Sequence, residues 1–301
     1  KVIYLDNHST TQVDKEVLKK MFPYFSDKFY NPHSINSKYN QDIIKDLKVA
    51  RSNIAKLIGA NIEDIVFTSG ATEANNMAIK GLELKIKRGK NHFITLNTEH
   101  KCVLEAMSRV ELNGGQLSVL KVNKKGLIDP KMIEKSIKSN TALVSIMFAN
   151  NETGVIQPIK KIAQICKEKK VLFHSDAAQA VGKVKINVKD MGIDLMSVSA
   201  HKFYGPKGIG ALYIRGFPRI RLIPLIDGGG QEINLRSGTL PVPLCIGFGE
   251  AAKIAKINLQ GEIKKTKELR DYFIISLKKK IDNIIINGDM KNRLPANINF
   301  S

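Results

Sequence analysis

Ser197-Val-Ser-Ala-His-Lys-Phe-Tyr-Gly-Pro-Lys-Gly208 is the stretch that best reveals the fold of this 301-residue chain. The apolar run 195–198 predicts a buried strand, and small and hydroxyl residues then surround Lys202. An earlier apolar run, 171–174, predicts a second strand, and Asp176 lies just past it. The sequence thus places a lysine at the end of one strand and a carboxylate at the end of another.

Outward from this stretch, apolar runs alternate with segments of helical periodicity. Strands are expected at 64–67, 92–95, 117–120, 143–147, 171–174, 195–198 and 210–214, and helices at 38–58 and 101–113. Continuous apolar strands separated by helices predict an α/β fold with a mostly parallel central sheet covered by helices on both faces. Cofactors bind such sheets beyond the C-terminal ends of the strands.

The chain changes character near residue 256. Residues 257–281 predict a long charged helix, and 284–286 and 297–300 are strand-like. We therefore expect a large domain over 13–255. A smaller α+β domain would consist of 1–12 and 256–301 and would be incomplete in this chain.

Composition excludes several classes of protein. The net charge of +20 suggests an acidic protein partner, because the lysines are spread along helices and aromatic residues are only 6% of the chain, which argues against direct nucleic-acid binding. No apolar run approaches the roughly 18–20 residues of a membrane span, and the first residues resemble a strand, not a signal peptide. The three cysteines are far apart and predict neither a disulfide framework nor a zinc site. A cytoplasmic location is expected.

Further polar residues follow the predicted strands. Residues 69–72, which include Ala71 and Thr72, precede a helix expected to begin near residue 73, so their backbone amides could bind phosphate. His100 and Asn151 each lie at another strand end. A capped helix, a structural histidine and an asparagine-rich turn are the alternatives for these three places.

Asp176, Gln179 and Lys202 together suit pyridoxal phosphate. A carboxylate beside the protonated ring nitrogen would keep the ring cationic, Gln179 could reach the ring oxygen, and Lys202 could hold the aldehyde. Thr239 follows an arginine, a serine and a glycine, and this segment suits phosphate binding. The alternatives are a helix N-cap for Asp176 and an ordinary surface lysine for Lys202.

These motifs occur in the order typical of one family. The matching segments are 4–6 with 10–11, 31–32, 67–73, 98–101, 150–154, 174–179, 199–208, 228–230 and 236–241. The chain resembles the cysteine desulfurases of the NifS/IscS type, which are pyridoxal-phosphate enzymes of fold type I. The resemblance covers essentially the whole chain.

The resemblance implies a role for each candidate residue. Lys202 would bond to the cofactor and move protons, and His100 would stack on its ring and act in acid–base steps. The other implied contacts are Asp176 with the ring nitrogen, Gln179 with the ring hydroxyl, Thr72, Ser199 and His201 with the phosphate, Ala71 with the cofactor, Asn151 with the substrate carboxylate and Thr239 with the phosphate of a neighbouring subunit. A homodimer with shared sites follows.

The implied activity is removal of sulfur from L-cysteine, which leaves alanine and an enzyme persulfide for iron–sulfur cluster assembly or tRNA thiolation. An iron–sulfur scaffold or another sulfur acceptor would be the partner. Family members carry the persulfide-forming cysteine on a loop that would lie beyond Ser301, and Cys102 is expected to be a packing residue of a helix. A selenocysteine lyase, another pyridoxal-phosphate lyase and a non-catalytic dimeric scaffold remain alternatives.

Overall fold

A computed structural model describes residues 3–34, 40–86, 89–216 and 220–301. Its sheet contains seven strands: β1 (Ile65–Thr68), β2 (His92–Leu96), β3 (Gln116–Leu120), β4 (Thr141–Ser145), β5 (Leu172–Asp176), β6 (Leu195–Ser199) and β7 (Gly210–Ile214). Their order across the sheet is β1-β7-β6-β5-β4-β2-β3. The strands are parallel except that β7 runs antiparallel to both of its neighbours. The α/β fold with a mostly parallel sheet is confirmed.

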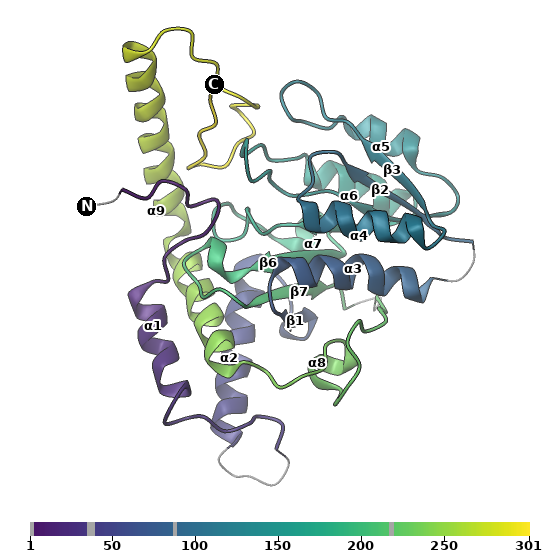
Figure 1. The fold of residues 1–301 in the computed structure, drawn as a ribbon, viewed down its shortest axis with the longest axis vertical. Helices are drawn as coiled ribbons and strands as arrows, with labels where there is room; N and C mark the ends of the chain where they lie inside the picture. Colours follow the sequence, from purple (N-terminus) through teal and green to yellow (C-terminus); the bar gives the residue numbers. More distant parts are fainter. Residues whose placement is uncertain (1–2, 35–39, 87–88, 217–219) are drawn as a thin grey trace.

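Helices cover both faces of the sheet (Figure 1). They are α1 (Lys15–Met21), α2 (Asn40–Ile58), α3 (Ala71–Lys85), α4 (Lys101–Leu112), α5 (Pro130–Ser136), α6 (Ile159–Glu168), α7 (Val188–Met191), α8 (Gln231–Asn234) and α9 (Val242–Lys280). Side chains of α3 and α4 pack with Phe93 and Leu143, whereas those of α2, α6 and α9 pack with Ile94 and Val144. Successive residues of one strand therefore enter the two different cores, which explains why the described strands other than the edge strand β3 are buried along nearly their whole length.

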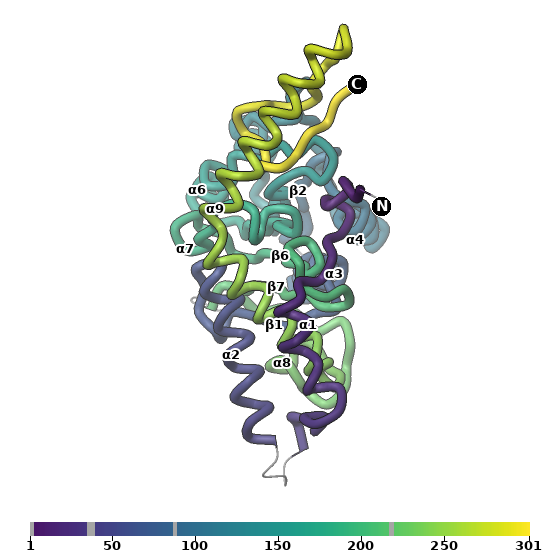
Figure 2. The backbone as a smooth tube through the Cα atoms, turned by 90° about the vertical axis from the view of Figure 1, so that its left-hand side faces the viewer, coloured from purple at the N-terminus to yellow at the C-terminus, as the bar shows by residue number. Residues whose placement is uncertain are grey.

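Helix α9 corrects the predicted helix at 257–281. It begins at Val242, and its N-terminal half packs against α2 and α1 (Figure 2). The predicted boundary between residues 255 and 256 therefore lies inside one continuous helix. Residues 284–286 and 297–300 form no strands in the described structure and share only a single bridge between Ile286 and Phe300. The division into two domains stays a prediction.

Candidate active site

A pocket of about 970 Å³ lies at the C-terminal ends of β5 and β6 and at the starts of α3 and α4. Every residue predicted for the site lines it except Thr239. These residues are Ala71, Thr72, His100, Asn151, Asp176, Gln179, Ser199, His201 and Lys202. The N-terminal segment 5–9 and the C-terminal segment 297–299 complete the walls. The sheet thus brings together residues that are far apart in the sequence, as expected for an α/β fold.

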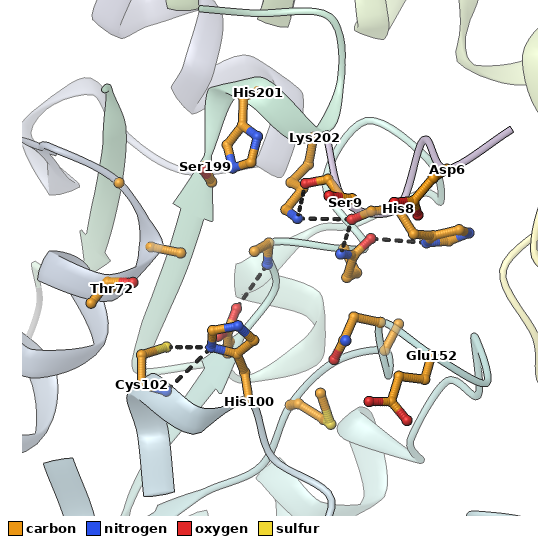
Figure 3. Close-up of a pocket in the computed structure, with 18 of the residues that line it drawn as sticks. Asp6, His8, Ser9, Thr72, His100, Cys102, Glu152, Ser199, His201 and Lys202 are labelled. Atoms are coloured by element: carbon orange, nitrogen blue, oxygen red, sulfur yellow. Dashed lines mark hydrogen bonds between the residues drawn. The ribbon is translucent and has the colours of Figure 1, made fainter. Parts of the chain in front are cut away.

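Lys202 ends a short 3₁₀ turn that follows β6. Its Nζ donates hydrogen bonds to the carbonyl oxygens of His8 at 2.8 Å and of Ser9 at 2.7 Å (Figure 3). Burial lowers the pKa of Lys202 below its ordinary value, although Asp176 and Asp6 oppose this shift. A lowered pKa leaves more of the amine uncharged at neutral pH, which favours nucleophilic attack on an aldehyde.

Asp176 is the last residue of β5 and is 7% exposed. One carboxylate oxygen accepts the N–H of Ala178 at 3.0 Å, and the other accepts an N–H of the Asn75 side chain at 2.7 Å. Burial raises the pKa of Asp176, and these two hydrogen bonds lower it in opposition. A buried carboxylate with two donors is well suited to face a cationic ring nitrogen.

His100 is the N-cap of α4, and this position determines which of its two ring nitrogens carries the proton. Its Nδ1 accepts the backbone N–H of Cys102 at 3.2 Å, so the neutral imidazole carries its proton on Nε2. Cys102 also lies in the pocket wall, with Sγ 3.0 Å from the same Nδ1. Cys102 packs against the core beside α3 and α4, as expected of a helix residue, and its thiol also reaches the pocket, which was not expected.

Gln179 has an amide whose orientation is decided by the backbone of His8. Its Nε2 donates to the carbonyl oxygen of His8 at 2.8 Å, and its Oε1 accepts a hydrogen bond from Lys183 Nζ at 3.0 Å. A backbone carbonyl can only accept, so the amide cannot be reversed. The second N–H of Gln179 can then donate to a ring oxygen. His8 Nδ1 lies 3.0 Å from Oε1 and must therefore carry its own proton there.

The phosphate end of the pocket consists of the loop after β1 and the start of α3. Ala71 and Thr72 begin this 15-residue helix, two residues earlier than predicted, and supply backbone N–H groups at its N-terminus. The N–H of Ser69 donates to the Glu73 carboxylate and that of Gly70 to the Thr68 hydroxyl. Ser199 is buried beside them at the end of β6. His201 bonds through Nδ1 to the Thr10 hydroxyl at 3.0 Å, and burial lowers its pKa to about 4, so its ring is neutral. These donors, with Asp176 and Lys202, fit pyridoxal phosphate at its three polar ends.

Two further predicted residues differ in their surroundings. Asn151 is half-buried in the pocket wall, beside a turn in which the Asn150 side chain accepts the N–H groups of Glu152 and Thr153. Thr239 is exposed and lies outside the pocket. Its contact with a neighbouring subunit stays a prediction.

One residue of the pocket wall and two residues behind it were not found from the sequence. His8 lies in the N-terminal segment, and Lys183 and Asn75 lie behind Gln179 and Asp176. The sequence signal for His8 was its place between segments 4–6 and 10–11, which match the family motif. The part of the chain that the structure describes holds no group of three or more metal-ligating side chains. Within the same residues, no helix combines the length and apolar character that a membrane crossing requires.

The comparison with known protein families agrees with this geometry. The family model of class-V aminotransferases matches residues 3–301. The chain belongs to the class-V aminotransferase family. Within it, the chain is 48% identical over 299 residues to the cysteine desulfurases IscS of Rickettsia massiliae and Rickettsia typhi, covering 99% of this chain and 73% of each relative. Class-V aminotransferases and cysteine desulfurases depend on pyridoxal phosphate, which is the cofactor of this chain.

Solved structures of the family have the same fold. A NifS-like protein matches with a TM-score of 0.95 and 36% identity, covering 100% of this chain and 82% of that one. SspA in complex with cysteine matches with a TM-score of 0.88 and 40% identity, covering 100% of this chain and 83% of that one. The chain is thus a pyridoxal-phosphate-dependent enzyme of the cysteine desulfurase group.

Proposed function

We propose that this protein removes sulfur from L-cysteine with Lys202, Asp176 and His100 as its principal site residues. The observation that carries the proposal is their convergence. An amine with a lowered pKa, a buried carboxylate and an imidazole of defined tautomer line one pocket. The family membership and the SspA–cysteine complex among the similar structures support cysteine as the substrate.

Each residue has a distinct task in this proposal. Lys202 would hold the cofactor through its aldehyde, and Asp176 would keep a proton on the ring nitrogen. Ala71 and Thr72, with Ser199 and His201, would hold the phosphate. When bound, pyridoxal phosphate accepts electrons from the substrate α-carbon. Lys202 Nζ, once released, moves the α-proton, and Asn151 orients the substrate carboxylate.

His100 presents Nε2–H to the pocket because its Nδ1 is occupied by the backbone of α4. The ring therefore donates a hydrogen bond or a proton at Nε2. In the overall reaction, a thiolate attacks the cysteine sulfur and forms an S–S bond while the C–S bond breaks. Its electrons remain with the carbon skeleton, and proton uptake gives alanine.

The attacking thiolate is not assigned to the three cysteines of this chain. Cys166 and Cys245 are fully buried. Burial raises the pKa of the Cys102 thiol to about 11, so it is a poor source of thiolate at neutral pH. A cysteine of another segment or another protein is therefore proposed as the sulfur acceptor.

The proposal extends to partners and location. We propose a homodimer in which Thr239 reaches the partner's phosphate site, a sulfur-acceptor protein of iron–sulfur cluster assembly or tRNA thiolation, and a cytoplasmic location. The IscS names of the relatives support the first kind of acceptor. The exposed position of Thr239 on the segment before α9 is compatible with the dimer.

The test combines product analysis with a spectrum. Protein loaded with pyridoxal phosphate should show yellow absorbance, and with L-cysteine and an added thiol it should release alanine. Lys202→Ala should remove both while its far-UV circular dichroism stays unchanged. An unchanged absorbance in Lys202→Ala would overturn the assignment of the lysine. Loading without alanine release would support the scaffold alternative, and a large preference for L-selenocysteine would support the lyase alternative.

A further inference from the structure

Asn75 connects two parts of the pocket without lining it. The residue lies in the second turn of α3 and is completely buried. Its Nδ2 lies 2.7 Å from Asp176 Oδ2 and 3.1 Å from Cys102 Sγ. An amide nitrogen carries two hydrogens, so both are used, one toward the carboxylate and one toward the sulfur.

Cys102 continues this connection to His100. Because Nδ1 of His100 already accepts the backbone N–H of Cys102, it must also be the acceptor for the thiol, whose Sγ lies 3.0 Å away. The thiol thus accepts from Asn75 and donates to His100, and the Thr72 side chain is a further hydrogen-bond partner of the same sulfur. The raised pKa of Cys102 agrees with a thiol that keeps its proton.

We propose that Asn75 is a positioning residue which, through the Cys102 thiol, links the Asp176 carboxylate to the His100 imidazole. The inference rests on the proposed function, because Asp176 and His100 are the two groups assigned to the cofactor ring. The connection has an acceptor at each end. His100 Nδ1 accepts from the thiol, and the Asp176 carboxylate accepts from Asn75. Asn75 stands at its centre because it is the only member that donates in both directions.

The buried side chain gives independent support. The Oδ1 atom of Asn75 is enclosed and has no hydrogen-bond partner among the described residues. A buried carbonyl without a partner destabilises the fold, so an apolar residue would pack better here. The two N–H groups of the side chain explain why an amide is suited to this position.

The link has a chemical consequence at each end. The N–H from Asn75 stabilises the negative form of Asp176. The shared proton is then favoured on the ring nitrogen over the Asp176 carboxyl group. At the other end, the thiol and the backbone N–H together hold the imidazole plane and its Nε2–H toward the pocket. Loss of Asn75 should therefore alter both ring contacts at once.

The experiment uses the holoenzyme without substrate. The variants are Asn75→Ala, Cys102→Ala and Cys102→Ser, with Asn76→Ala and Cys166→Ala as matched controls. Asn76 is in the same turn of α3 but donates to the Thr72 carbonyl, and Cys166 lies in α6 away from the pocket. Two properties are measured: the rate at which pyridoxal phosphate leaves the protein, and the pH dependence of its visible absorbance.

Asn75→Ala should release the cofactor about tenfold faster and shift the pH profile, because a hydrogen bond to a charged group is lost. Cys102→Ala should give a smaller change of about threefold, and Cys102→Ser should return to within about twofold of the wild type, because its hydroxyl can both accept and donate. The controls should match the wild type. If Asn75→Ala does not fold, the alanine–serine pair at position 102 carries the test.

The inference would be overturned if Asn75→Ala bound and titrated the cofactor as the wild type does. It would also be overturned if Cys102→Ser behaved like Cys102→Ala, because the thiol would then act only through its size. Both readouts are taken without cysteine. A wild type that holds its cofactor but leaves cysteine intact would therefore contradict the proposed function and still allow this link to be tested.

Discussion

Lys183→Met tests whether burial beside Lys202 keeps the Lys183 amine uncharged in the folded protein. Lys183 Nζ donates a hydrogen bond to Gln179 Oε1 at 3.0 Å. Burial and then the nearby charge of Lys202 lower the pKa of Lys183 to about 7, from 10.5 in an unfolded chain. The folded protein should therefore be less stable at neutral pH, where folding must remove or bury the charge of Lys183, than at higher pH.

The size of the effect follows from the two pKa values. Between pH 7 and pH 10.5 the unfolded chain binds a proton that the folded chain has released, so the contribution of Lys183 to stability rises with pH in this window. At about 1.4 kcal/mol per pH unit, the penalty is on the order of 4 kcal/mol at pH 7 and 2 kcal/mol at pH 9. Methionine has a similar length and no charge. The free energy of unfolding of Lys183→Met minus that of the wild type should therefore fall by about 2 kcal/mol from pH 7 to pH 9.

Urea unfolding of both proteins at pH 7, 8 and 9, in the same cofactor state and at one protein concentration, measures this difference. Methionine cannot donate the hydrogen bond to Gln179 and buries a more apolar side chain, but neither effect depends on pH, so both cancel in the comparison between pH values. Lys185→Met, which replaces an exposed lysine two residues away, is the matched control and should show a constant difference. A constant difference for Lys183→Met as well would refute the reasoning and mean that Lys183 is charged in the native protein throughout this range.

Two other predictions concern the core and the pocket thiol. Glu232 is 7% exposed, and its carboxylate accepts Arg51 at 2.6 and 2.8 Å and the Phe67 N–H at 2.6 Å. Glu232→Ala should lower the free energy of unfolding in urea by about 2–4 kcal/mol, because the partly buried Arg51 cation and the buried Phe67 N–H lose their acceptor; a loss below about 1 kcal/mol would contradict this. The raised pKa of Cys102, about 11 against 9.0, should slow its alkylation by iodoacetamide at pH 8 roughly a hundredfold relative to an ordinary thiol. Mass spectrometry of peptides measures the rate, and alkylation as fast as in a denatured sample would disprove the prediction.

Much of the sheet could be predicted because its strands are apolar on both faces. The predicted strands at 92–95, 195–198 and 210–214 all fall inside β2, β6 and β7. The long helix was placed too late because residues 242–256 are small and apolar on most sides and carry no clear helical period. This part of α9 is buried against α1 and α2, so its pattern resembles that of the core and not that of a surface helix.

The site could be predicted in its outline and not in its connections. Lys202, Asp176 and His100 were found because each lies at or just beyond the end of a strand, and parallel strands end at one edge of a sheet. His8 and Lys183 were missed because their place in the site depends on hydrogen bonds to the Gln179 side chain, which no sequence motif indicates. The contact from His8 to that amide spans 171 residues of sequence, and no periodic pattern reports it.

The sequence by itself determined which chemical groups stand at the strand ends, since apolar strand patterns and the motif at 197–208 are local properties of the chain. Only the tertiary structure decided how those groups are oriented. The amide of Gln179 is oriented by the His8 carbonyl, and the thiol of Cys102 accepts a hydrogen bond from Asn75, each over about 3 Å and each from another segment of the chain. Hydrogen bonds act over that distance and have a direction. The proton positions therefore become defined only when separate segments meet in the folded pocket.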